Sequence, residues 1–158
     1  DRMSELSILG LKELDAALQE LPAKLEKNIL RGAMRAGAKV MLDAARQQVP
    51  VRTGALRDSL TVRSGYQRGR VTGTVRAGNS KVYYAHMVEF GTAKHFIKPK
   101  TARSLFIAGL FRDGVDHPGA RGRPFMRPAF DASAPAAIEA MAEYLRERIP
   151  KEFAKAGL

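Results

Sequence analysis

The chain has 158 residues, 45% of them apolar and 27% charged, which is enough to bury a modest core in a single domain. It has no cysteine, which excludes disulfides and cysteine metal sites, and no apolar run approaches the roughly 20 residues of a membrane-spanning helix. The net charge is +11, and residues 52–123 hold 14 basic and 4 acidic side chains, which leaves +10 in that segment alone. This basic middle predicts contact with nucleic acid or an acidic protein, and a solvated basic surface is the alternative.

The first 48 residues have the periodicity of two helices. Leucines recur at intervals of three and four, as one helix face requires, and Pro22 suits the first turn of a second helix. In that second helix, small residues such as Gly32 and Gly37 permit close approach of another element. We predict helices over residues 10–48, ended by Pro50 because a proline forces the preceding residue out of the helical conformation. The periodic apolar positions are Leu11, Leu14, Leu18, Leu21, Leu25, Ile29, Ala33, Ala36, Val40 and Ala44.

The stretch VPVRTGALRDSL, residues 49–60, is the corner at which the long helix gives way to strands. Its proline and glycine predict extended chain followed by a turn at Gly54. Residues 59–78 then predict a hairpin, in which apolar side chains alternate on either side of a glycine-rich turn. The alternating residues are Leu60, Val62, Val71 and Val75.

The second half of the chain has weaker patterns. Residues 81–92 fit either a strand or a helical turn ended by Gly91, and we predict a strand that enters a short helical turn. Residues 103–111 read as one apolar strand, and the turn-rich residues 112–124 as an exposed loop.

A helix is predicted over residues 126–150, and Pro150 is expected to end or kink it, with a tail or a last loose turn behind it. We therefore predict one α+β domain over 1–158. A long N-terminal helix and a C-terminal helix pack on a small, mainly antiparallel sheet with long basic loops, and the sheet and loops occupy residues 51–123.

Residues that carry chemistry are scarce. The three histidines, His86, His95 and His117, are not at metal-ligand spacings, and the neighbouring Asp113 and Asp116 read as turn residues rather than as ligands of a divalent ion. No serine lies in a G-x-S-x-G context, and no phosphate-binding or dinucleotide-binding glycine motif is present. We predict no catalytic residue, no metal site and no cofactor, so that the chain is not an enzyme.

Three motifs occur in order behind the long helix: VPVRTGALRDSL, YYAHMVEFGTAKH and HPGARGRPFMRPAF. Together they resemble the tail-completion, or head–tail connector, proteins of long-tailed bacteriophages and prophages, whose pattern is P-x-x-T-G-x-L-x-x-S, then Y-A-x-x-x-E-F-G-T, then P-F-x-R-P-A. Each match alone is weak, whereas three in order over about half the chain are specific. Residues 96–116 depart from the family, because shorter members lack this segment.

The resemblance implies a non-enzymatic structural protein of the virion neck, assembled in the bacterial cytoplasm. Such proteins form rings, often hexamers, around the channel through which DNA leaves the head. The expected partners are further copies of the chain, other neck, connector or tail-tube proteins, and DNA in passing, with no membrane partner. The alternatives are a basic accessory protein that binds nucleic acid without sequence preference, and a morphogenesis factor absent from the mature virion.

The resemblance also implies roles for single residues. Pro50, Thr53 and Gly54 would hold the corner, with the Thr53 hydroxyl bonding local backbone. The turn Glu89-Phe90-Gly91-Thr92 would pack Phe90 inward while Gly91 takes a conformation denied to other residues.

The C-terminal motif would pin the last helix to the sheet. Direct partner contact is the alternative role of all these positions. The structural motif comprises Pro50, Thr53, Gly54, Leu56, Glu89, Phe90, Gly91, Thr92, Pro124, Phe125, Arg127 and Pro128. The candidate contacts to a neighbouring ring or to DNA are Arg68, Arg70, Lys98, Lys100, Arg121 and Arg123.

Overall fold

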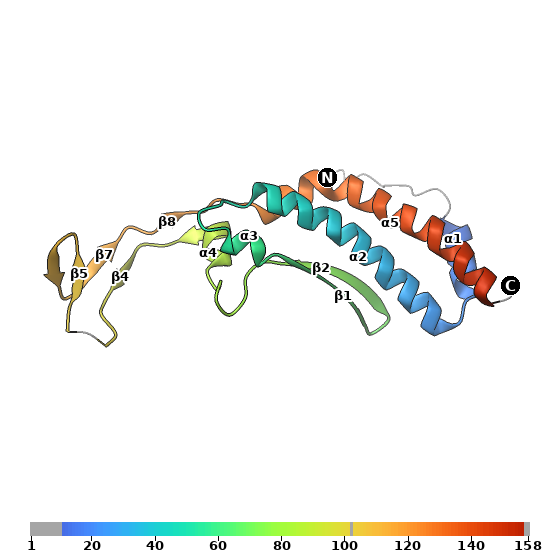
Figure 1. The fold of residues 1–158 in the computed structure, drawn as a ribbon, viewed down its shortest axis with the longest axis horizontal. Helices are drawn as coiled ribbons and strands as arrows, with labels where there is room; N and C mark the ends of the chain where they lie inside the picture. The colour runs from blue at the N-terminus through green and yellow to red at the C-terminus, as the bar shows by residue number, and fades with distance from the viewer. Residues whose placement is uncertain (1–10, 102, 157–158) are drawn as a thin grey trace, which may run out of the picture. The chain divides into compact units, whose positions relative to one another are not determined.

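The computed structural model describes residues 11–101 and 103–156, and it has the predicted α+β composition (Figure 1). Contacts between residues divide the chain into two compact units. The first unit comprises the residues up to Ala44, Thr61–Arg76, and the chain from Ala132 onward; the second comprises Ala45–Leu60 and Ala77–Asp131. A division by contacts does not measure whether either unit folds alone, so one domain over 1–158 stays a prediction.

The first unit contains the predicted helices. Helix α1 is Leu11–Gln19, α2 is Ala23–Gln48 and α5 is Met126–Ala156; the last two also contribute residues to the second unit. The two helices α1 and α2 are separated at Pro22, whose carbonyl accepts the Leu25 N–H at 2.8 Å. The buried Leu18, Leu21 and Ile29 form a cluster that joins α1 to α2 and α5.

Helix α5 continues past Pro150, so the predicted end at residue 150 and the tail behind it are wrong. Ile149 and Phe153, on either side of the proline, both pack against the leucine cluster. Burial of these side chains offsets the hydrogen bond that the proline removes.

Helices α2 and α5 lie side by side and run antiparallel in the first unit (Figure 1). A Cβ placed on Gly32 would overlap the Tyr144 hydroxyl, and one on Gly37 would lie 2.7 Å from the Met141 side chain. The predicted close approach at these small residues is therefore confirmed, and α5 is the element that approaches.

The predicted hairpin is also confirmed. Strand β1 is Thr61–Gln67 and β2 is Arg70–Arg76, paired antiparallel in a register that sets Val62 opposite Val75. Both turn residues, Arg68 and Gly69, have positive φ angles (50° and 75°), as a type I′ turn requires. One face of the hairpin lies on α2, and a Cβ on Gly73 would come within 2.6 Å of the Met34 carbonyl oxygen.

The second unit begins with the end of α2 and contains two short helices, α3 (Ala55–Asp58) and α4 (Ala85–Phe90). The ambiguous residues 81–92 therefore contain the predicted short helix, which Gly91 ends, but no strand leads into it. The buried side chains of this unit are mostly apolar, and Phe125 is fully buried among them. They are Ala45, Val49, Leu56, Ser59, Leu60, Val82, Ala85, Glu89, Phe125 and Ala129.

The second unit also contains a two-stranded ribbon formed by the described residues between 91 and 121, here called the arm. It consists of three successive antiparallel ladders: β3 (Gly91–Thr92) with β8 (Ala120–Arg121), β4 (His95–Ile97) with β7 (Val115–His117), and β5 (Leu105–Ile107) with β6 (Leu110–Arg112). The first two ladders share one register, and β5–β6 forms the tip, defined as residues 105–112.

Two predictions fail in the arm. Residues 103–111 are not one strand, because Ala108 and Gly109 turn the chain with φ angles of 51° and 83°. Residues 112–124 are not all loop, because they contain β7 and β8. The described strands form four separate two-stranded ladders rather than one small sheet.

Candidate docking site where the three motifs meet

The first motif forms a tight corner in the second unit. Gly54 has a φ of 83° and precedes α3, and its carbonyl accepts the Asp58 N–H at 2.9 Å. The Thr53 hydroxyl oxygen accepts the Ala55 N–H at 3.4 Å, which is the local backbone contact expected for it. Leu56, the apolar position of the motif, is buried.

Ser59 closes this corner and was missed as a structural residue, because sequence reasoning tested it only as a nucleophile. Its buried hydroxyl donates to the Leu56 carbonyl at 2.6 Å and accepts the Gly78 N–H at 2.9 Å. The serine thus ties the corner to the segment that leads into α4. Its place as the last residue of the family pattern P-x-x-T-G-x-L-x-x-S was the only available signal.

Glu89 joins the second motif to the third, which sequence reasoning also missed. Its Oε2 accepts the N–H groups of Phe125 (2.7 Å) and Met126 (3.0 Å), and its Oε1 accepts that of Arg127 (3.1 Å). The first N–H groups of a helix have no partner within the helix, and the helix dipole favours a negative charge there. A buried carboxylate 36 to 38 residues earlier in the chain therefore caps α5.

The environment of Glu89 keeps it ionised. Burial raises the pKa of its carboxyl, but the three backbone N–H hydrogen bonds together lower it by more, so the pKa lies below its ordinary value. All polar side-chain atoms that are fully buried among the described residues have partners.

Phe90 does not pack inward: its side chain is 83% exposed, so this prediction is wrong. The buried side of α4 is formed by Ala85 and Glu89, four residues apart, and Phe90 lies one position past that face. Gly91, by contrast, has the special conformation that we predicted, with a φ of 80°. A Cβ there would overlap the Ala120 carbonyl oxygen, so the β3–β8 pairing needs glycine at this position.

The remaining motif residues form the base of the arm and the start of α5. The Thr92 hydroxyl oxygen accepts the Ala120 N–H at 2.9 Å across β3 and β8. Phe125 anchors α5 by burial, whereas Pro124, Arg127 and Pro128 are exposed. Arg127 pairs with Asp131 one turn further along the helix, at 3.3 Å. The helix is thus held at this end by Phe125 and by the backbone N–H groups that Glu89 caps.

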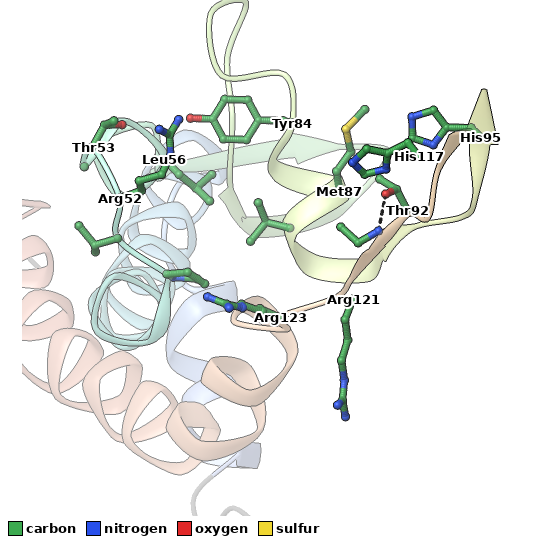
Figure 2. Close-up of a pocket in the computed structure, with 15 residues that line it drawn as sticks. Arg52, Thr53, Leu56, Tyr84, Met87, Thr92, His95, His117, Arg121 and Arg123 are labelled. Carbon is green, nitrogen blue, oxygen red and sulfur yellow. Dashed lines mark hydrogen bonds between the residues drawn. The ribbon is translucent and has the colours of Figure 1, made fainter. Parts of the chain in front are cut away.

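The three motifs surround one pocket of about 500 Å³, entirely within the second unit, here called the motif pocket (Figure 2). Its lining combines apolar side chains with cationic and imidazole groups and includes no carboxylate. The Arg121 side chain extends away from the other labelled residues (Figure 2). The lining residues are Pro50, Val51, Arg52, Thr53, Gly54, Leu56, Tyr84, Met87, Val88, Thr92, His95, His117, Ala120, Arg121 and Arg123.

Two histidines stand at the arm side of this pocket. His95 and His117 face each other across β4 and β7, with ring centroids 4.9 Å apart. The His95 Nδ1 lies 2.9 Å from the Ala93 carbonyl oxygen, and the His117 Nδ1 accepts the Gly119 N–H at 3.1 Å. Among the described residues, no group of three or more His, Cys, Asp or Glu side chains could hold a metal ion.

The six candidate contact residues lie in both units. Arg68 and Arg70 are at the turn of the first unit's hairpin; Lys98 and Lys100 are on the arm; Arg121 and Arg123 line the motif pocket. All six are exposed. Of the 14 basic residues in 52–123, Arg57 is the one with an ion-pair partner among the described residues, Asp58 at 3.6 Å. The basic side chains of this segment are therefore exposed and mostly without ion-pair partners among the described residues, and contact with an external partner stays a prediction.

The comparisons with known proteins identify one family. The model of the family described as "Bacteriophage HK97-gp10, putative tail-component" matches residues 12–91, just over half of the chain. The match includes α2, the first motif and the second motif as far as Gly91, and it ends where the arm begins. The chain has no significant match among curated proteins or among solved structures. No helix in the described part of the chain is long and apolar enough to cross a membrane.

Proposed function

Since the chain belongs to the HK97-gp10-like family of bacteriophage tail components, we propose that it is a non-enzymatic structural protein of the virion neck. In this role it completes the tail or joins it to the head, as a ring of identical subunits around the DNA channel. Family membership is the observation that carries the proposal. We add three parts to it: the neck position, a ring with six as its expected number of subunits, and assembly in the host cytoplasm.

The hydrogen bonds of the motif residues support a structural role. Ser59, Glu89 and Thr92 direct their side chains to backbone N–H and carbonyl groups rather than into a site for substrate. The lining of the pocket that the motifs surround includes no carboxylate, serine or cysteine. These features suit a rigid docking surface better than a catalytic centre.

The distribution of charge suits a place beside DNA. Exposed basic side chains without ion-pair partners predominate in residues 52–123, as the contact between a ring and passing duplex requires. A closed ring of identical subunits needs two different faces on each subunit, because each copy contacts its neighbours head to tail.

The first test is made on the phage itself. A phage that lacks this gene should produce filled heads and separate tails, and the gene supplied in trans should restore joined virions, both counted by electron microscopy. Substitution of Arg121→Glu and Arg123→Glu together should block joining without unfolding the chain. Arg31→Glu with Arg35→Glu, two exposed arginines of α2 outside the basic segment, is the matched control.

The outcomes separate the parts of the proposal. Normal virions in the absence of the gene would refute the neck role altogether. Normal joining by the Arg121 and Arg123 variant would refute only the assignment of these two arginines as contacts.

A second candidate function is non-specific binding of nucleic acid, which the same unpaired basic residues favour. Such a protein should bind any duplex, with an affinity that falls steeply as salt rises because counterions are released on binding. A ring lumen that lets DNA slide past should bind short duplexes weakly. Fluorescence anisotropy of a labelled duplex over a salt series decides between the two.

A further inference from the structure

The tip of the arm exposes four large apolar side chains. Phe106 is 66% exposed, Ile107 37%, Leu110 57% and Phe111 76%, and the two phenylalanine rings lie with centroids 5.0 Å apart and planes tilted by 52°. Residues 105–111 carry no charge. A contiguous exposed apolar cluster of this kind marks an interaction site.

Neither face of the tip is covered by the rest of the described chain. Successive strand residues point to opposite faces, so Phe106 and Phe111 share one face while Ile107, Leu110 and Arg112 share the other. Both faces are largely exposed. A two-stranded hairpin is marginally stable in water unless something packs against it, so the tip needs a cover from outside its own chain.

The second unit also contains a cavity of matching character. The motif pocket has an apolar lining that includes Val51, Leu56, Tyr84 and Met87, and about 500 Å³ lies within the range of pockets that enclose side chains or ligands. A chain's own tip does not fill it, because the two phenylalanines are exposed.

The pocket is lined by arginines, and the chain behind the tip has two carboxylates that can pair with them, although residues 94–116 hold five basic side chains against these two acidic ones. Arg52 and Arg123 line the pocket, which has no carboxylate of its own. Behind the tip, Asp113 and Asp116 have no ion-pair partner among the described residues, and Arg112 points to the face opposite Phe111. The phenylalanine face can therefore enter the pocket without bringing a positive charge with it.

We propose that the Phe106–Phe111 face of one copy docks in the motif pocket of a second copy. The contact is heterologous, since a different surface is used on each side, and repetition of it links copies head to tail. This inference rests on the proposed function, for which it supplies the interface between subunits. It also gives a role to the arm, which lies outside the family match except for Gly91.

The test uses two variants of the full chain, each with one damaged surface. Phe106→Ser with Phe111→Ser damages the tip, and Met87→Lys damages the pocket. Phe130→Ser, an equally apolar and 52% exposed position outside both surfaces, is the control. Light scattering over a hundredfold concentration range should show growing assemblies for the wild type and the control. Each damaged variant should keep the mass of one chain, with a dissociation constant raised at least tenfold.

Mixing the two damaged variants gives the sharper result. The intact tip of one fits the intact pocket of the other, so an equimolar mixture should form 1:1 dimers and nothing larger. If the pocket variant alone forms dimers, tips contact tips, and the proposal is overturned. It is equally overturned if the wild type stays monomeric at every concentration. Head–tail joining in the phage is scored separately, so the proposed function can survive either outcome.

Cross-linking gives a second readout that does not depend on damaged variants. The native chain has no cysteine, so Phe106→Cys and Val51→Cys each introduce one thiol, on the docking face of the tip and at the pocket. Oxidation of the mixture should yield a covalent dimer of the two variants, in excess over either variant alone. Equal yields from Phe106→Cys alone, or from Ile107→Cys on the opposite face mixed with Val51→Cys, would contradict the proposal.

Discussion

Two hairpins of this chain have the same turn geometry, but their apolar side chains are half-buried in one and largely exposed in the other. Both β1–β2 and β5–β6 turn at two residues with positive φ, Arg68-Gly69 and Ala108-Gly109. In the first hairpin one face is half-buried and lies on α2, while the other carries polar and charged groups. In the second hairpin both faces are largely exposed, although nearly every residue is apolar.

The turn and the strand pairing of a hairpin depend on residues close together in the sequence. The element that packs over the hairpin does not have to be close in the sequence. The first hairpin alternates in period two because α2 lies on one side of it. The second lacks that alternation, since Leu-Phe-Ile faces Leu-Phe-Arg without a polar side. Such a surface fits a position between two protein layers better than one in water, which is why we place it against a second copy.

The largest effect is expected at the base of the arm, where Glu89 holds the chain that carries the second hairpin. Glu89→Ala should lower the free energy of unfolding by about 3 kcal/mol, because three backbone N–H groups lose a charged acceptor. Urea unfolding followed by circular dichroism measures it. Glu139→Ala, which removes an exposed carboxylate paired with Arg146, is the control and should change little. An equally small effect at Glu89 would show that α5 starts without this cap.

The same carboxylate predicts a dependence on pH. Since the folded pKa of Glu89 lies below its ordinary value, its ionised form contributes its full stabilisation above that ordinary value. The contribution is lost as the pH falls through the lowered folded pKa, when the carboxylate becomes protonated. The difference in unfolding free energy between wild type and Glu89→Gln should therefore shrink from neutral pH toward about pH 3. A difference that grows on acidification would contradict this assignment.

The next largest effect is expected when one cross-strand pair of apolar side chains is replaced in each hairpin, which compares their contributions to stability. Val62→Ser with Val75→Ser should lower the free energy of unfolding by about 2 kcal/mol, because both half-buried side chains lie on the covered face. Phe106→Ser with Phe111→Ser should leave it unchanged in dilute solution, since neither ring is covered by its own chain. Thermal unfolding of both variants at low protein concentration measures this.

The phenylalanine variant also has a concentration dependence that sharpens the comparison. The wild type should gain thermal stability as its concentration rises, because assembly stabilises the folded chain by mass action, and the variant should not. If the phenylalanine pair proves as costly to replace as the valine pair at low concentration, the tip is covered within its own chain. The comparison between the hairpins would then fail.

Much of the fold was predictable because its signals are local. The leucine spacing in α1 and the alternating valines of β1 and β2 each depend on neighbours within a few residues. The glycines of α2 indicated a close approach, but not that α5 makes it. The turn at Gly54 and the special conformation of Gly91 were predictable for the same reason. The resemblance of three short motifs identified the family, and the family match confirms it.

The failures arose where partners are distant in the sequence. Glu89 accepts hydrogen bonds from residues 36 to 38 positions later, and Ser59 from Gly78, 19 positions later, and no periodicity encodes either pairing. Phe90 was expected inward because it is aromatic, yet the helix face that is buried there contains a carboxylate instead. The end that we predicted for the last helix at Pro150 is wrong, because packing of its neighbours against α1 and α2 lets the helix continue.

The smallest effect is expected from substitutions in the turns of the two hairpins. Gly69 and Gly109 have φ angles of 75° and 83°, and nothing lies within 4 Å of a Cβ added at either. Gly69→Ala and Gly109→Ala should therefore each cost about 1 kcal/mol from the left-handed backbone alone. Because β1–β2 is packed on α2, the first cost should appear in the global free energy of unfolding. The second should leave that quantity unchanged and instead speed amide hydrogen exchange within residues 105–112, because an uncovered hairpin can open without the rest. Slow exchange at the tip in assembled protein, and fast exchange in dilute protein, would then show that a second copy supplies the missing cover.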